Sequence, residues 1–154
     1  MNTSQLFFSI ILIYLPAMVA NMAPIAAHRM SVLLWLDRPL NTHLLGTNKT
    51  VRGFVVGIGA GAITAVLMLL VTSTFPYDSL TRASMYGAAT SFGALVGDVA
   101  KSYFKRLLHI PPGTSWIPFD QIDFVIGATL VGIFFIHIPI VVAASALIVI
   151  GLAS

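Results

Sequence analysis

The chain contains no cysteine and no glutamate, and only 8% of its 154 residues are charged. Without cysteine there can be no disulfide, no thiolate nucleophile and no cysteine-based metal site, and the redox compartment stays open. Soluble domains carry about 25% charged residues, so this low charge, together with 58% hydrophobic residues, indicates an integral membrane protein. The net charge of +3 comes from eight Lys and Arg against five Asp. It reflects basic loops beside a bilayer, and we expect no nucleic acid partner.

Five apolar segments are predicted to cross the membrane as helices, at about 6–27, 52–72, 80–100, 122–136 and 139–152. The first lacks the basic start of a signal peptide, so we expect it to be a helix of the mature protein. The last apolar run is too long for one span and is interrupted at His137-Ile138-Pro139, which favours two short spans over one tilted, kinked helix. No polar stretch is long enough to bury its own core. The expected fold is an all-α bundle forming a single transmembrane domain over residues 1–154.

Small residues recur every four positions in the second and third spans. The two stripes are Gly53, Gly57 and Gly61, and Ala89, Gly93 and Gly97. Such stripes let helices approach closely in a membrane, so we expect the second and third spans to pack together. The run 57–61 is not favoured as a nucleotide-binding loop, because it follows no predicted strand.

Charged residues gather at one end of the predicted bundle. The loops after the first and third spans hold most of the basic residues, namely Arg29, Arg38, Lys49, Arg52, Lys101, Lys105 and Arg106, whereas the loop after the second span holds only Arg82. The positive-inside rule then places these two loops in the cytoplasm, the amino terminus outside and the carboxyl terminus inside. Asp98, Asp120 and Asp123 lie at the same end. Basic anchors need no acids beside them, so this cluster suggests a functional site in the two cytoplasmic loops.

The spacing of these residues indicates metal and phosphate chemistry. Asp98, Lys101 and Lys105 share one helix face, and Asp120 and Asp123 share the first turns of another. Three carboxylates brought together would suit Mg²⁺. The second span begins among Asn48, Lys49 and Arg52, where cations and a helix amino terminus favour an anion. A nucleotide is therefore the expected ligand, although the basic residues could be simple membrane anchors and the acids helix caps and ion-pair partners.

These residues also carry a resemblance to a known family. The segment 48–53 (Asn-Lys-Thr-Val-Arg-Gly), the pair Gly97-Asp98 followed by Lys101 and Lys105, and the segment 118–123 (Pro-Phe-Asp-Gln-Ile-Asp) resemble motifs of the archaeal CDP-archaeol synthases. The motifs occur in the family's order and with its five-span layout, and the resemblance covers nearly the whole chain.

The resemblance implies an Mg²⁺-dependent cytidylyltransferase in the cell membrane that faces the cytoplasm. Its substrates would be CTP and an isoprenoid ether-lipid phosphate, 2,3-bis-(O-geranylgeranyl)-sn-glycerol 1-phosphate, and its products CDP-archaeol and diphosphate. The expected catalytic residues are Asp98, Lys101, Asp120 and Asp123; the expected CTP ligands are Asn48, Lys49, Arg52, Lys101 and Lys105; and the expected metal ligands are Asp98, Asp120 and Asp123. The alternatives are an enzyme like the CDP-alcohol phosphatidyltransferases, whose aspartate signature is only echoed here, and a small non-enzymatic transporter, which would place ionisable residues at mid-span.

The lipid substrate demands a site that opens in two directions. We expect a polar cytoplasmic cavity bounded by the ends of the second, third and fourth spans, continuous with an apolar groove open to the bilayer. The groove should flank the contact between the second and third spans, with the first and fourth spans as its walls. The three histidines near this end, His28, His43 and His109, are expected to be loop or interfacial residues.

Overall fold

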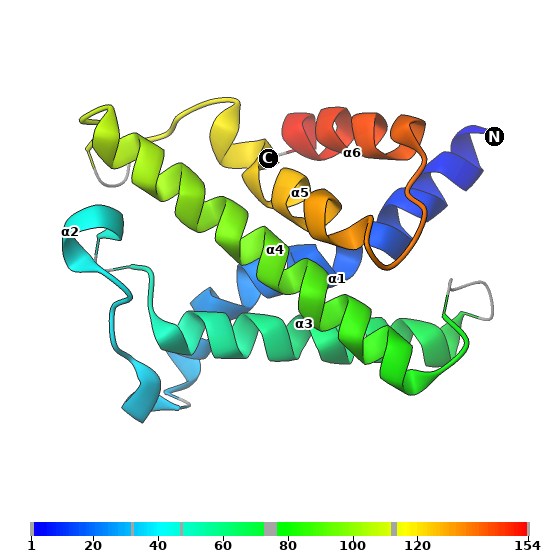
Figure 1. Ribbon diagram of the computed structural model, residues 1–154, viewed down its shortest axis with the longest axis horizontal. Helices are drawn as coiled ribbons and strands as arrows, with labels where there is room; N and C mark the ends of the chain where they lie inside the picture. Colours follow the sequence, from blue (N-terminus) through cyan, green and yellow to red (C-terminus); the bar gives the residue numbers. More distant parts are fainter. Residues whose placement is uncertain (1, 32, 47, 73–76, 112–113, 154) are drawn as a thin grey trace.

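The computed structural model describes residues 2–31, 33–46, 48–72, 77–111 and 114–153, which form helices and no strand (Figure 1). An isolated bridge joins Pro39 and Thr50. The all-α prediction is confirmed. The helices are α1 (Thr3–Met30), the 3-10 helix η1 (Leu34–Leu36), α2 (Thr42–Leu45), α3 (Val51–Val71), α4 (Leu80–Leu107), α5 (Phe119–Gly132) and α6 (Ile140–Ala153).

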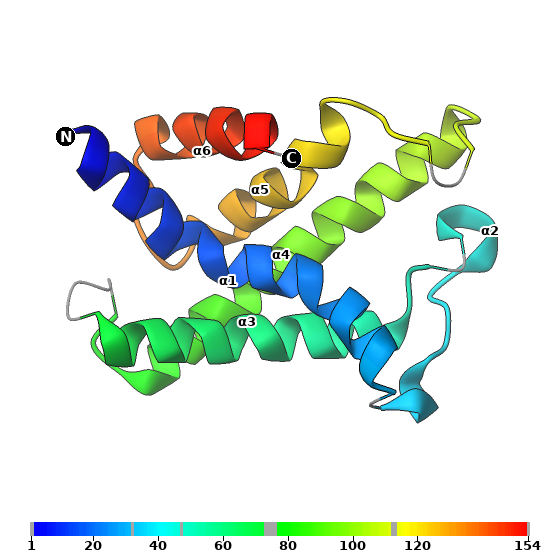
Figure 2. The ribbon, with the colours of Figure 1, turned by 180° about the vertical axis from the view of Figure 1, so that it is seen from behind.

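The longer helices lie side by side and run in alternating directions along the molecule (Figures 1 and 2). The closest neighbours are α4 with α5, α1 with α3, and α3 with α4, while α6 packs on α5 and α1. Because the directions alternate, the carboxyl ends of α1 and α4 and the amino ends of α3 and α5 meet at one end of the molecule. The short helix α2 lies at this end too. The fold therefore gathers the segments that carry most of the charged residues.

Apolar side chains cover the outside of this bundle. By length and composition, α1 and α3 could each cross a membrane, and only 33% and 17% of their most apolar windows are buried inside the protein. Large apolar residues such as Val71 and Leu70 are 82% and 68% exposed. A soluble protein would not leave so much apolar surface in water. The outer surface is therefore suited to lipid, and the protein is placed in a membrane.

The last apolar run forms two helices, as expected, with the break at residues 133–139. Each of these helices has 14 residues and is about 21 Å long at 1.5 Å per residue, shorter than the roughly 30 Å hydrocarbon core. The helix α4 continues past the expected end of its span at Ala100 to Leu107. The loop predicted between the second and third spans includes residues 73–76, which lie outside the described residues.

The expected partner of the second small-residue stripe is wrong. Gly93 and Gly97 face α5 and not α3: a Cβ on Gly93 would collide with the carbonyl oxygen of Gly127, and one on Gly97 with that of Asp123. The backbones of α4 and α5 are thus in direct contact. This contact sets the position of Asp123 relative to α4.

The helix α3 does pack closely on α4, but through other residues. A Cβ on Gly87 of α4 would lie 2.5 Å from the carbonyl oxygen of Gly61. Gly57 approaches α1 as well, because its Cβ would lie 2.8 Å from the carbonyl oxygen of Ala20. The first stripe therefore serves two neighbours, α1 and α4.

Buried hydroxyl groups also hold the helices together. Tyr14 of α1 is fully buried and its hydroxyl lies 2.6 Å from the Thr129 hydroxyl of α5. The Tyr86 hydroxyl of α4 donates to the carbonyl oxygen of Ile13 at 2.9 Å. In an apolar surrounding a buried polar group needs such a partner. These bonds tie α1 to α4 and α5 in the interior of the bundle.

Candidate active site

The loop before α3 is closed by backbone hydrogen bonds that fix Lys49. The Leu40 amide donates to the Lys49 carbonyl oxygen at 2.7 Å, and the Val51 amide donates to the Arg38 carbonyl oxygen at 2.9 Å. The Thr50 hydroxyl then accepts from the Gly53 amide at 3.1 Å and caps α3. An extended backbone at Thr50 separates Lys49 from the helix, so its ammonium can reach α4.

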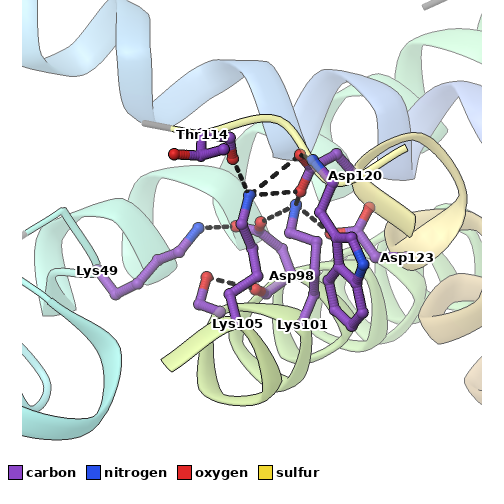
Figure 3. Close-up of polar contacts among 9 residues, drawn as sticks. Lys49, Asp98, Lys101, Lys105, Thr114, Asp120 and Asp123 are labelled. Carbon is purple, nitrogen blue, oxygen red and sulfur yellow. Dashed lines mark hydrogen bonds and ion pairs between the residues drawn. The ribbon is translucent and has the colours of Figure 1, made fainter. Parts of the chain in front are cut away.

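Three carboxylates surround the ammonium of Lys101 (Figure 3). Lys101 Nζ lies 3.0 Å from Asp98 Oδ1, 3.3 Å from Asp120 Oδ1 and 2.8 Å from Asp123 Oδ2. Lys49 pairs with the other oxygen of Asp98. We call this group, with Lys105, the Lys101 cluster; it contains Lys49, Asp98, Lys101, Lys105, Asp120 and Asp123. Three ammonium groups face three carboxylates, so the cluster is balanced in charge.

Asp120 is held by Lys105 of α4 and by the loop that precedes α5. Lys105 Nζ lies 3.1 Å from both of its carboxylate oxygens, and the Trp116 amide donates to Oδ2 at 2.6 Å. The Lys101 ammonium also lies 3.3 Å from Oδ1. Two ammonium groups and a backbone amide therefore surround the Asp120 carboxylate.

Asp123 is the most buried carboxylate of the cluster, with a side chain only 6% exposed. Although the Lys101 ammonium lies 2.8 Å from Oδ2, neither carboxylate oxygen has a well-directed hydrogen bond from any described residue. Buried carboxylates are costly unless they are paired and hydrogen-bonded. Asp123 thus has oxygen lone pairs left to bind a further cation or a donor.

The carboxylates of the cluster offer the hard oxygen ligands that Mg²⁺ prefers. In this structure they converge on the Lys101 ammonium, and the described residues contain no group of three acidic or histidine side chains already arranged around a metal position. The unsatisfied oxygens of Asp123 fit a divalent cation. The donor set is therefore suitable, provided that the Lys101 ammonium moves.

A cavity with both polar and apolar lining opens on one side of the cluster, and we call it the polar cavity because charged side chains lie in its wall. It has a volume of about 320 Å³ and lies between α1, α3 and α4, with Lys49 and Asp98 in its wall. Asn21 of α1 and Asn48 also line it. We expected the ends of the second, third and fourth spans, α3, α4 and α5, to bound this cavity. The structure confirms α3 and α4, but α1 replaces α5. A polar residue near the end of an apolar span, here Asn21, is the sequence signal for this cavity.

An apolar groove opens on the other side of the cluster. It has a volume of about 550 Å³ and runs between α4 and α5, and Lys101 and Asp123 lie in its wall. The remaining lining is almost entirely apolar and includes Phe92, Val96, Phe104, Trp116, Ile122, Ile126 and Leu130. We expected the first and fourth spans, α1 and α5, to form the walls of this groove. The structure confirms α5, but α4 takes the place of α1.

Arg52 lies apart from the Lys101 cluster. It lines a second cavity of about 420 Å³ beside the polar cavity, and its side chain contacts His28 and Asp37. Arg52 Nη2 lies 2.9 Å from His28 Nδ1. The structure therefore brings together Lys49 and the expected residues of α4 and α5, places Asn48 between the two cavities, and separates Arg52 from them. His28, expected to be an ordinary loop residue, is a partner of Arg52.

Known proteins are similar to this chain in sequence and in fold. A family model described as CarS-like, CDP-archaeol synthase, matches residues 3–153. A CDP-archaeol synthase of Thermococcus gammatolerans is 38% identical over 122 residues, covering 74% of this chain and 67% of its own. One of Aeropyrum pernix is 36% identical over 124 residues, covering 80% of this chain and 68% of its own.

A solved structure, described as an intramembrane enzyme for archaeal membrane lipids biosynthesis, has the same fold. It matches with a TM-score of 0.74 and 33% identity over 93% of this chain and 90% of its own. The family model covers nearly the whole chain, and the relatives exceed 30% identity over more than two thirds of it. The chain belongs to the CarS-like family of CDP-archaeol synthases.

Proposed function

We propose that the Lys101 cluster is the catalytic centre at which this CDP-archaeol synthase, a CTP-dependent nucleotidyltransferase of membrane-lipid biosynthesis, joins its two substrates. An oxygen of the lipid phosphate attacks the α-phosphorus of CTP, the new P–O bond forms as the bond to the bridging α,β oxygen breaks, and diphosphate leaves. The family assignment replaces the two alternatives, a CDP-alcohol phosphatidyltransferase-like enzyme and a transporter. The chain forms one catalytic domain, in keeping with the match over residues 3–153.

One observation carries the proposal: the polar cavity and the apolar groove lie on two sides of α4 and meet at the cluster. Asp98 faces the cavity and Lys101 faces the groove, and the two side chains are 3.0 Å apart. A lipid phosphate has a charged head and apolar chains, so it needs such a boundary. The isoprenoid chains would occupy the groove between α4 and α5, and CTP would enter the cavity from water.

The residues of the cluster do most of their work by positioning and by neutralising charge. A lipid phosphate monoester is largely ionised near neutral pH, so no strong base is needed. The ammonium groups of Lys49 and Lys101 lie at the cavity and the groove respectively, where they can hold phosphate oxygens of the two substrates. Holding two reactants in register accounts for a large part of such a rate enhancement.

Asp98, Asp120 and Asp123 would hold Mg²⁺. When bound, the metal supplies charge neutralisation to the phosphates in the transition state. Without the metal, the Lys101 ammonium holds these carboxylates close together. When Mg²⁺ binds, this ammonium would turn from the carboxylates to a phosphate oxygen. Lys101 would thus both organise the metal ligands and bind substrate.

The protein would sit in the cell membrane as a multi-pass protein with five crossing helices, α1, α3, α4, α5 and α6. Their alternating directions support this arrangement, and the basic residues at the amino end of α3 and the carboxyl end of α4 support a cytoplasmic site. The amino terminus would then be outside and the carboxyl terminus in the cytoplasm. The 14-residue helices α5 and α6 would require local thinning of the bilayer.

The test is a reaction with purified protein in detergent, labelled CTP, Mg²⁺ and the isoprenoid ether-lipid phosphate. We expect a labelled CDP-lipid and diphosphate in equal amounts, and loss of both products in Asp98→Asn. Arg82→Ala is the control. Arg82 is exposed, pairs with Asp78, and lies in the first turn of α4, whereas the cluster residues of α4 lie near its other end. Failure of the wild-type protein to form a CDP-lipid would refute the proposed reaction, and full activity of Asp98→Asn would refute the site.

A further inference from the structure

A short apolar segment of the loop between α1 and α2 leaves most of its side-chain surface uncovered. The residues Leu33, Leu34 and Trp35, in and just before η1, are 40%, 59% and 72% exposed. The segment lies beyond the carboxyl end of α1, at the edge of the molecule (Figures 1 and 2). We propose that η1 is an anchor that inserts between the lipid headgroups of the bilayer and thereby holds Lys49 of the Lys101 cluster in place. The role of Lys49 in this inference rests on the proposed function.

The depth of η1 in the membrane follows from its connection to α3. The 21 residues of α3 span about 32 Å at 1.5 Å per residue, close to the roughly 30 Å hydrocarbon core. Val51, the first residue of α3, therefore lies near the boundary of the hydrocarbon. The Val51 amide donates to the Arg38 carbonyl oxygen at 2.9 Å. Because η1 ends only two residues before Arg38, it lies at the level of the headgroups.

The chemistry of η1 suits this boundary. The indole of Trp35 is apolar with one N–H donor, the combination that is enriched at membrane–water interfaces. The Leu36 amide donates to the Leu33 carbonyl oxygen at 2.9 Å. The Asp37 amide donates to the Leu34 carbonyl oxygen at 3.0 Å. These internal hydrogen bonds reduce the cost of moving the backbone out of water.

The surroundings of η1 indicate that its occupant is lipid. On the last turns of α1, Ile25 and Met30 are 65% and 70% exposed, so the lipid-facing surface of the bundle continues up to this loop. Arg29 and Arg38 lie on either side of η1 in the sequence, and both are exposed. Basic side chains beside an apolar surface attract the phosphates of lipid headgroups. The apolar surface of η1 is therefore covered by the bilayer in which the protein sits.

The backbone that leads into η1 is strained. Ser31 has a φ of 51° and Leu33 a φ of 53°. This left-handed region is unfavourable for a bulky residue such as leucine. Such strain persists only where the surroundings compensate for it. Few protein atoms cover Leu33 and Leu34, so insertion of these side chains into lipid supplies the compensation.

The anchor is connected to the Lys101 cluster through the backbone pairing that follows η1. Two residues after η1, an isolated bridge joins Pro39 and Thr50. The Leu40 amide donates to the Lys49 carbonyl oxygen at 2.7 Å. A displacement of η1 would therefore move this pairing, and with it the Lys49 ammonium that pairs with Asp98. Insertion of η1 into the bilayer thus positions a residue of the site.

The first test is the fluorescence of Trp35 in vesicles. Trp116→Phe leaves Trp35 as the only tryptophan of the chain. The full-length protein is placed in vesicles of phosphatidylcholine and phosphatidylglycerol whose acyl chains carry bromine either near the headgroup or at the chain end. We expect several-fold stronger quenching by bromine near the headgroup, and weak quenching by iodide in the water. Strong quenching by iodide, stronger quenching from the chain end, or no quenching by bromine overturns the anchor.

The second test measures the connection to Lys49 by amide hydrogen exchange in the same vesicles, without substrate. Trp35→Ser should speed exchange of the Leu40 and Val51 amides about tenfold, because their hydrogen bonds open more often once η1 is released. Val71→Ser is the matched control, since Val71 is 82% exposed and lies at the opposite end of α3. It should leave both amides unchanged. Unchanged exchange in Trp35→Ser, or equal acceleration in both variants, overturns the connection.

A further variant and the wild-type reaction separate the possible failures. If Trp35→Ser does not fold, Leu34→Ser removes a smaller part of the same surface and should speed exchange of the same amides. Neither test needs turnover. Absence of CDP-lipid from the wild-type protein would refute the proposed function and leave the anchor standing. Normal CDP-lipid formation together with iodide quenching of Trp35 would refute the anchor alone.

Discussion

Replacement of Lys101 by methionine should make the stability of the protein depend on Mg²⁺. The ammonium lies within 3.3 Å of three carboxylates and its side chain is 15% exposed. After the change Asp98 keeps Lys49 and Asp120 keeps Lys105, but Asp123 loses the only ion pair that the described part of the chain gives it. The Lys101→Met protein should therefore be less stable in the absence of a divalent cation.

The size of the effect can be worked out from the cluster. Breaking a buried ion pair costs about 3–5 kcal/mol, and partial exposure of Lys101 places this case at or below the lower figure. A divalent cation between the carboxylates would restore the lost attraction. A ligand at about 100 times its Kd stabilises by about 2.7 kcal/mol, or about 5–10 °C in Tm for a chain of this length. In the wild-type protein the ammonium competes with the metal, so the same concentration should stabilise less.

The assay is thermal unfolding in detergent across a Mg²⁺ titration, followed by tryptophan fluorescence. We expect a larger rise in Tm for Lys101→Met than for the wild-type protein, and no CDP-lipid formation at any Mg²⁺ concentration. Lys105→Met is the control, because its partner Asp120 keeps bonds to Lys101 and to the Trp116 amide. If Mg²⁺ raises the Tm of the wild-type and Lys101→Met proteins equally, the metal does not bind where the ammonium lies.

Three other changes probe the metal, the helix contact and the core. Asp123→Asn keeps its shape but loses its charge, so CDP-lipid formation should fall by orders of magnitude while circular dichroism stays unchanged; normal turnover would remove Asp123 from the site. Gly97→Ala should cost about 1–3 kcal/mol of unfolding free energy and most of the activity, whereas Gly59→Ala, in open space, should be neutral or slightly stabilising; equal effects would contradict the close contact. Tyr14→Phe removes the bond to Thr129 and should lower the unfolding free energy by about 1 kcal/mol with activity retained, a loss that denaturation in detergent would detect.

Hydropathy predicted where the helices are better than where they end. It ended the third span at Ala100, where the charged residues begin, but α4 continues to Leu107 because Lys and Arg are good helix formers. The opposite error occurs after α5. The apolar run continues to Ile136 while the helix ends at Gly132, because an apolar turn in or near lipid has the same composition as a helix. Hydropathy reports the environment of a segment, and only indirectly its hydrogen bonding.

The partner of a small-residue stripe cannot be derived from its spacing. Gly93 and Gly97 show only that α4 has a smooth face, and both α3 and α5 offer small residues to meet it. The deciding residue is Gly127, whose place on α5 opposite Gly93 depends on the loop that connects α4 to α5. The four-residue repeat is a property of one helix, whereas the helix that packs against it is determined by the topology of the whole fold.

Sequence reasoning grouped the acids and lysines of the site correctly in space, but it also grouped Arg52 with them. Lys49 and Arg52 are three residues apart, and on a continuous helix they would share a face. Thr50 between them is extended, so that relation is lost and Arg52 turns towards His28. A cap residue directly before a helix is a signal that helical spacing stops there. Asn21 and His28 lie on the mostly apolar α1, where isolated polar residues give no spacing pattern that indicates a site.

The contact between α4 and α5 shows why the packing and the chemistry of this protein cannot be separated. The absence of a side chain at Gly97 lets the Asp123 backbone lie directly on α4, and this approach places the Asp123 carboxylate beside Lys101, one turn further along. The same pair of helices encloses the apolar groove. A larger residue at 97 would push α5 away, moving an acid from the cluster and changing the groove in one step. Glycine at this position therefore sets both the spacing of the charged groups and the space beside them.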